Sequence, residues 1–244
     1  MVENNTKQQL IMIVTDTLPG DLNYSKLENL RFVGSFVRKG LWAELDLNGA
    51  VSKETIWSYL LNGTTVYPTE NSLMVEILQN NNKPIYIFDP PVPIAHPAVK
   101  STDKIGQILE QDDWQLIIIN SPSGIPQSAG VNISPDDWQS WDDHIGGLTK
   151  VADYNPIILV LAIADKDQGK SWIFTGGSKI ASLGNPGPVN ILDIAPTILW
   201  ILDIDIPQSM EGRIMNEILD TGMDFTAEEM DLLTDHLRGL GYLG

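Results

Sequence analysis

The stretch Ile191-Leu-Asp-Ile-Ala-Pro-Thr-Ile-Leu199, with Ile206-Pro and Met210-Glu-Gly-Arg213 after it, is the most distinctive part of the sequence. It predicts the start of a helix, because the Asp193 carboxylate can accept hydrogen bonds from the amides of a first helical turn. Pro196 then falls where a helix needs no backbone donor. The apolar residues that follow form one stripe: Ile194, Ile198, Leu199 and Leu202. We therefore expect a helix packed against an apolar core.

Short apolar runs recur along the rest of the chain and predict β-strands. The strongest runs are Leu10–Val14, Pro84–Phe88, Gln115–Ile119 and Ile157–Ile163, and further candidates are Leu41–Leu45 and Ser171–Thr175. Three of these runs are apolar at nearly every position, which is typical of parallel strands with both faces of the sheet covered.

Helical patterns lie between the apolar runs, at Ser25–Lys39, Thr55–Asn62, Asn71–Asn80 and Pro135–Asp153. Alternation of strands and helices predicts an α/β fold, with a mostly parallel central sheet and helices on both faces. The chain has 244 residues and no segment with the composition of a linker. We expect a single domain over residues 1–244, with an acidic helical C-terminal tail from about residue 217 to residue 244.

The charge balance excludes several classes of partner. The sequence has 15 Lys and Arg against 32 Asp and Glu, a formal net charge of −17. A field of that sign repels nucleic-acid phosphates and anionic membrane surfaces, so we expect neither as a partner. Seven acidic residues and no basic one lie between Glu217 and Asp235. This acidity either keeps the protein soluble or forms a docking face for an unknown protein partner or a second copy of the chain.

Cysteine chemistry is excluded, because the sequence contains no cysteine. The apolar run Leu10–Val14 is too short for the core of a secretory signal, and no stretch approaches the roughly 20 apolar residues of a membrane span. We therefore expect a cytoplasmic protein.

The Ile191–Arg213 stretch resembles the end of the catalytic domain in the alkaline phosphatase superfamily, above all in its type I phosphodiesterase/nucleotide pyrophosphatase and sulfatase branch. Weaker likenesses occur in the same order along the chain, at Ile11–Asp16, Phe36–Ala43, Trp57–Gly63, Asp89–Pro93 and Leu237–Leu243. The resemblance implies an alkaline-phosphatase-like fold for the whole chain.

The resemblance also implies a two-metal chemistry, in which about six Asp and His ligands hold two ions that activate a Ser, Thr or formylglycine nucleophile. Asp16 stands at the first ligand position, although an aspartate at a strand end is also a common turn or capping residue. The nucleophile position, ten residues before Gly63, is occupied by Lys53. Ser52 is the only possible substitute, and its alternative role is to cap the helix that follows.

The remaining ligand positions of the resemblance are mostly lost. No Asp or His lies between Asn120 and Pro135, where the family has both. Asp165 matches the aspartate of a family Asp-His-Gly motif, but Lys166 stands where the histidine belongs, and Asp167 does not replace it without a change of backbone. None of the three histidines, His96, His144 and His236, falls at a ligand position. Asp16 and Asp165 are therefore vestigial ligand positions of a degenerate member.

Two functions stay open at this point. The first is a pseudoenzyme that has lost the two-metal site and the nucleophile, needs no cofactor, and is retained for binding or assembly. The alternative is a metal-dependent phosphodiesterase, phosphatase or sulfatase-like hydrolase with rewired ligands, in which Ser52, Asp16 and Asp165 form the core and Zn²⁺ or Mn²⁺ is the cofactor.

A second acidic cluster, Asp136, Asp137, Asp142 and Asp143, surrounds two tryptophans on one expected helix. It lacks the alternating ligands, the central Gly and the terminal Glu of a calcium-binding loop. We expect a solvated acidic face with the tryptophans turned inward.

Overall fold

The computed structural model describes residues 8–15, 27–50, 52–66, 72–91, 94, 99–100, 104–111, 113–120, 139, 142–143, 146–147, 156–164, 170–177, 180 and 186–216. The expected acidic helical tail lies outside these ranges. So does most of the helix expected over Pro135–Asp153, of which residues 139, 142, 143, 146 and 147 are described and are helical.

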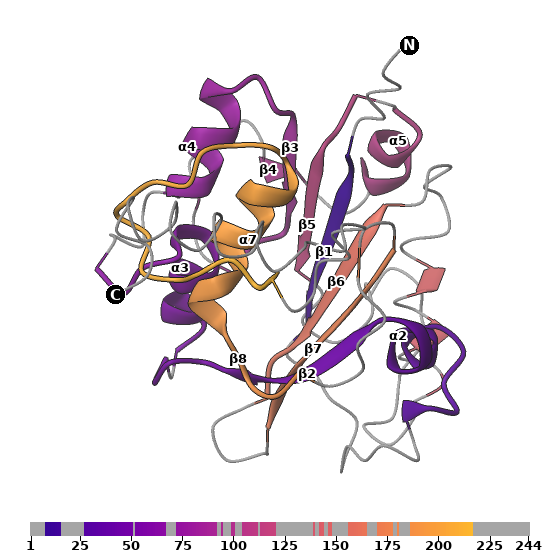
Figure 1. Cartoon of the computed structure of the whole chain (residues 1–244). Helices are drawn as coiled ribbons and strands as arrows, with labels where there is room; N and C mark the ends of the chain where they lie inside the picture. Colours follow the sequence, from indigo (N-terminus) through magenta and orange to yellow (C-terminus); the bar gives the residue numbers. More distant parts are fainter. Residues whose placement is uncertain are drawn as a thin grey trace, which may run out of the picture.

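An eight-stranded sheet forms the centre of the molecule, in the order β4-β3-β5-β1-β6-β7-β2-β8 (Figure 1). Among the described strands, β7 alone runs antiparallel to its neighbours β6 and β2, so the expectation of a mostly parallel sheet is confirmed. The strands are β1 Leu10–Thr15, β2 Leu41–Asp46, β3 Ile85–Phe88, β4 Val99–Lys100, β5 Leu116–Asn120, β6 Ile157–Ala162, β7 Ser171–Gly176 and β8 Val189–Asn190.

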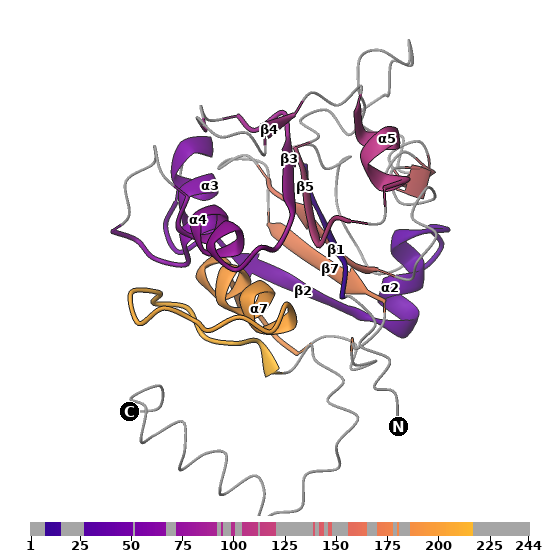
Figure 2. The ribbon, with the colours of Figure 1, turned by 90° about the horizontal axis from the view of Figure 1, so that it is seen from above.

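Both faces of the sheet are covered, which explains why its central strands are apolar at nearly every position. Leu10, Met12 and Val14 of β1 join one core cluster, and Ile11 and Ile13 join the other. Helices α3 (Lys53–Asn62), α4 (Leu73–Asn80) and α7 (Ile194–Ile201) cover the first face, and α2 (Val33–Lys39) and α5 (Ile105–Leu109) cover the second (Figure 2). None of the helices described in the structure is long and apolar enough to cross a membrane.

Helix α2 is shorter than the helix expected over Ser25–Lys39, because it begins only at Val33. The apolar stripe of the expected helix is nevertheless buried, including Leu27 and Leu30. The start of α2 is set by a residue far away in the sequence: the Asp142 carboxylate accepts hydrogen bonds from the amides of Phe32 (2.8 Å) and Val33 (2.7 Å). The expectation of a solvated acidic face is therefore wrong for Asp142, whose exposed fraction is 0%.

The distinctive Ile191–Leu199 stretch forms a short 3-10 turn, Ile191–Asp193, that leads directly into α7. The capping role expected of Asp193 is wrong, since its side chain makes no capping hydrogen bond. Asn190 caps the turn instead, because its Oδ1 accepts from the Leu192 amide at 2.9 Å. The Asp193 carboxylate reaches Arg213, accepting from the backbone amide at 2.9 Å and lying 3.7 Å from Nε.

The Met210–Arg213 turn is hydrogen-bonded to the end of α3. The amides of Glu211 and Gly212 both donate to the carbonyl of Gly63, at 2.7 and 3.2 Å. Gly63 ends α3 in the left-handed conformation, with φ of 62°. Gly212 also lies directly on the turn before α7, where a Cβ atom would stand 2.0 Å from the Leu192 carbonyl oxygen. The whole stretch therefore fixes the place of α3 on the sheet.

Candidate functional site

The carboxyl ends of the central parallel strands meet at one edge of the sheet, the place where open α/β sheets bind ligands. Val14 near the end of β1 is the register partner of Asn120, the last residue of β5. Ile163 follows β6 directly, and its amide donates to the Thr15 carbonyl at 2.7 Å. These three side chains form the floor of a pocket.

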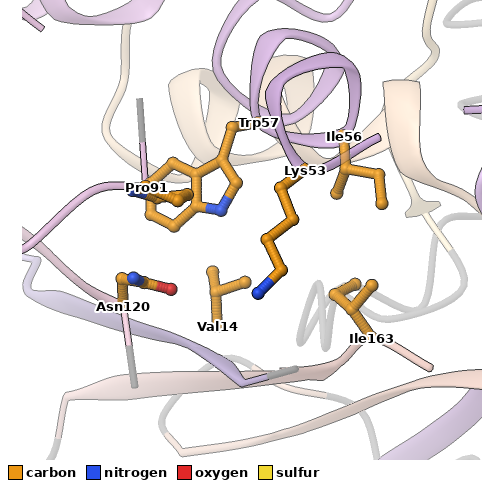
Figure 3. A pocket seen from close by; sticks show the side chains of 7 residues that line it. All are labelled: Val14, Lys53, Ile56, Trp57, Pro91, Asn120 and Ile163. Atoms are coloured by element: carbon orange, nitrogen blue, oxygen red, sulfur yellow. The ribbon is translucent and has the colours of Figure 1, made fainter. Parts of the chain in front are cut away.

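Helix α3 forms a second wall of this pocket with its first turn. Ser52 caps the helix, because its Oγ accepts from the Thr55 amide at 3.1 Å. Lys53 is therefore the first helical residue, and its side chain runs from α3 toward Val14 at the strand ends (Figure 3). Ile56 and Trp57, one turn further on, are both buried and complete this wall.

The pocket has a volume of about 220 Å³ and mostly apolar walls. Its lining residues are Val14, Lys53, Ile56, Trp57, Pro91, Asn120 and Ile163. Asn120 donates its Nδ2 to the Asp89 carbonyl at 2.7 Å, and its oxygen points into the pocket (Figure 3). The lining residues therefore offer one ammonium group and one amide oxygen between apolar surfaces.

Beside the pocket, the start of α3 favours negative charge. Hydrogen bonding from the backbone amide of Glu54 is the largest cause that lowers the pKa of this exposed carboxyl. The Ser52 hydroxyl and the positive charge of Lys53 lower it further. This agrees with the preference of helix N-termini for acidic groups.

The described lining residues do not fit a divalent metal. Zn²⁺ takes thiolate, imidazole or carboxylate ligands, and Mn²⁺ prefers carboxylates, carbonyls and water. An ammonium group and hydrocarbon walls offer none of these, and the single amide oxygen of Asn120 is too few. Within the described ranges, no group of three or more His, Asp or Glu side chains has the arrangement to hold an ion.

The structure places one of the residues singled out in the sequence inside the pocket. Lys53 lines it, while the hydroxyl of its neighbour Ser52 contacts Thr55, with 3.1 Å between Ser52 Oγ and Thr55 Oγ1. The vestigial ligand positions Asp16 and Asp165 lie outside the described residues, as do Lys166, Asp167 and the three histidines.

Sequence reasoning missed Trp57, Pro91 and Asn120 as parts of the pocket wall. Asn120 could have been found, because it is the polar residue that ends a continuously apolar strand. Trp57 gave no such signal, since a tryptophan on the apolar stripe of a helix is ordinary core. Pro91 lies two residues after Asp89, whose φ of 46° marks a turn directly after β3.

No sequence-family model and no curated protein matches this chain. Solved structures do match its fold. Human ectonucleotide pyrophosphatase/phosphodiesterase 5 aligns with a TM-score of 0.65 at 8% identity, over 88% of this chain and 100% of that one. Its murine counterpart aligns with a TM-score of 0.61 at 8% identity, over 82% and 96%. A 2-O GAG sulfatase aligns with a TM-score of 0.58 at 12% identity, over 88% and 74%.

These similarities define the class of the structure: it has the α/β fold of enzymes that cleave phosphoric and sulfuric esters. More narrowly, the chain has the alkaline-phosphatase-like fold shared by phosphodiesterases and sulfatases, and the resemblance stated from the sequence is confirmed at the level of the fold.

Proposed function

We propose that this chain is a pseudoenzyme with an alkaline-phosphatase-like fold, which lacks the two-metal site and the nucleophile and serves in binding or assembly. The observation that carries the proposal is the place of Lys53. Its side chain occupies the start of α3 and points to the ends of the parallel strands, where the resemblance puts a nucleophile. A protonated amine is no alkoxide nucleophile, and its charge repels a metal ion at the same spot.

The alternative, a hydrolase with rewired ligands, needs Ser52 as its nucleophile. Ser52 already serves as the cap of α3, because its Oγ accepts from the Thr55 amide at 3.1 Å. Ser52 is also absent from the described lining of the pocket. Both observations favour the capping role that the sequence left open for this residue.

The metal content of the purified protein tests the proposal most directly. We expect well under one equivalent of zinc or manganese per chain after incubation with either ion and desalting. A metal-dependent phosphodiesterase of the same fold, treated in parallel, serves as the control for metal loss during handling. Two bound ions per chain would refute the proposal and favour the hydrolase.

A pair of serine variants separates the two functions through Ser52. Ser72 caps α4 in the same way, with its Oγ accepting from the Val75 amide at 3.2 Å. Ser52→Ala and Ser72→Ala should each lower the free energy of unfolding by about 1 kcal/mol, the usual cost of losing such a cap. We expect no turnover of nitrophenyl phosphate, phosphodiester or sulfate esters by any form. Metal-dependent turnover that disappears in Ser52→Ala but persists in Ser72→Ala would establish the alternative.

In this proposal, the chain binds a protein partner or a second copy of itself in the cytoplasm. Trp200 on α7 is 43% exposed, and exposed tryptophans are enriched in protein interfaces. Light scattering of the full chain and of a chain ending at Asp220 tests whether the acidic tail takes part. An unchanged monomer mass in both would remove self-association from the proposal.

A further inference from the structure

We propose that the pocket at the strand ends binds a small organic carboxylate, a monoanion with a flat apolar body. The inference rests on the proposed function, because two metal ions at the same strand ends would displace such a ligand. The pocket has about 220 Å³, which is below the common range of roughly 300–1,000 Å³ for drug-sized ligands. It therefore suits a molecule smaller than a drug-sized ligand.

Lys53 is the residue that we expect to bind the anionic head of the ligand. It is the only charged side chain among the described residues that line the pocket, and it enters from α3 toward Val14 (Figure 3). An ammonium group carries three N–H donors, so it can donate to a carboxylate in addition to a contact within the protein. Hydrogen bonds between two charged groups are roughly twice as strong as neutral ones, so the charge on the ligand is expected to dominate its affinity.

Asn120 is the reason that we expect the ligand to carry a single negative charge. Its Nδ2 donates to the Asp89 carbonyl at 2.7 Å, so the pocket receives the oxygen of the amide and not the donor. An oxygen acceptor repels a second anionic group. Phosphate dianions and dicarboxylates are therefore disfavoured against a molecule with one carboxylate and an apolar or hydroxyl-bearing opposite end.

The walls of the pocket indicate that the body of the ligand is apolar. Val14, Ile56, Trp57 and Ile163 are all buried, with exposed fractions between 3% and 7%. Pro91 closes the pocket on the side of β3. Apolar walls with few polar groups are the usual composition of small-molecule sites, and an aromatic ligand ring packs well against aromatic and apolar side chains such as Trp57 and Pro91.

Calorimetric titration of the full chain with phenylacetate, phenylacetamide and phenyl phosphate tests this inference. We expect saturable binding of phenylacetate and binding of the neutral amide that is weaker by about tenfold, the effect of one charge-assisted hydrogen bond. Phenyl phosphate should bind more weakly than phenylacetate. Equal affinity for the amide, tighter binding of phenyl phosphate, or no saturation with phenylacetate would each overturn the inference.

Lysine variants locate the binding. Lys53→Met should weaken phenylacetate binding by about tenfold, and Lys53→Arg should retain it because the charge is kept. Lys39→Met is the matched control: Lys39 is an exposed lysine in the last turn of α2, outside the pocket. Equal losses in Lys53→Met and Lys39→Met would show binding elsewhere and refute the site. If Lys53→Met fails to fold, Lys53→Gln serves as the uncharged variant, and the same loss of about tenfold is expected against unchanged binding in Lys39→Met.

The metal content of the same sample keeps the two proposals distinguishable. A metal-free chain that does not bind phenylacetate refutes only the ligand inference and leaves the pseudoenzyme proposal standing. Two bound ions refute the pseudoenzyme proposal whatever the titration shows.

Discussion

The segment Asn190–Asn216 and the pocket at the strand ends both contact helix α3, one at its end and the other at its start, yet they are built in opposite ways. In the segment, polar groups bind backbone: Asp193 accepts from the Arg213 amide, and the Glu211 and Gly212 amides donate to Gly63. In the pocket, the described side chains are mostly apolar and face a cavity. Sequence likeness is strongest in the first region and weaker in the second, where Lys53 stands at the nucleophile position.

The two regions show that the residues that set a fold and the residues that line a cavity within it are separable. A change in the segment disturbs backbone contacts that hold α3 and α7 in place, so it affects the stability of the fold. In the pocket, a change that removes only the charge of Lys53 alters a wall next to open space and has little effect on packing, whereas Val14, Ile56, Trp57 and Ile163 also belong to the core. A distinctive stretch of the first kind therefore identifies an architecture and does not guarantee an activity.

The largest effect that tests this comparison is expected from Gly212→Ala. The new Cβ would meet the Leu192 carbonyl oxygen at 2.0 Å and its carbon at 2.3 Å, both backbone atoms that cannot rotate away. We expect a loss of about 3 kcal/mol or more in the free energy of unfolding, measured by urea denaturation.

Gly106→Ala is the control for Gly212→Ala. Gly106 lies in α5 with nothing within 4 Å of its built Cβ, so alanine there should stabilise the protein by about 0.5–1 kcal/mol through helix propensity. If Gly212→Ala were tolerated as well as Gly106→Ala, the segment would not fix the fold and the comparison would fail.

One contact that sets the start of α2 has no signature in the sequence around it. Asp142 holds the start of α2 through the Phe32 and Val33 amides, which lie 110 and 109 residues away in the sequence. Asp142→Ala leaves both amides without this acceptor and should cost about 2 kcal/mol in the free energy of unfolding. Asp143→Ala, at an exposed neighbour, should change it by less than about 0.5 kcal/mol. Equal effects of the two variants would show that the contact is incidental.

The pH dependence of stability gives a further check on Asp142. Burial raises the pKa of Asp142 above its ordinary value, although the amides of Phe32 and Val33 oppose the rise by favouring the ionised form. In the pH range between the unfolded and the folded pKa, the folded protein therefore binds more protons than the unfolded chain. The contribution of Asp142 to stability is largest below the unfolded pKa and falls as the pH rises through the folded pKa. Asp142→Asn should lack this slope; an identical pH profile would contradict the assignment.

Much of the fold was predictable because local sequence patterns specify its strands and helices. The continuous apolar runs at Leu10–Val14 and Gln115–Ile119 indicated strands covered on both faces, and they are β1 and β5 of the sheet. The start of α2 was not predictable, because its partner Asp142 is brought there only by the tertiary structure. The role of Asp193 was misjudged for the same reason: its partner Arg213 is 20 residues away.

The candidate site was predictable only in part. Lys53 was found because the resemblance marks its position relative to Gly63. The walls formed by Trp57 and Ile163 were not, since an apolar residue at a strand end or on a helix gives the same signal in a packed core and in a pocket. Whether a cavity remains between apolar side chains depends on how the elements pack, which no local pattern specifies.

The smallest predicted effect lies at Asp203, inside the Asn190–Asn216 segment. Asp203 follows α7 with φ of 58°, the left-handed region that favours glycine, and its amide donates to the Trp200 carbonyl at 3.0 Å. Asp203→Gly should therefore raise the free energy of unfolding by about 0.5 kcal/mol. Asp205→Gly removes the same charge from an exposed position where φ is not positive, and it should lower stability by a similar amount. A gain in both variants would assign the effect to the loss of charge, whereas a gain at Asp203 alone assigns it to the left-handed backbone conformation at this residue.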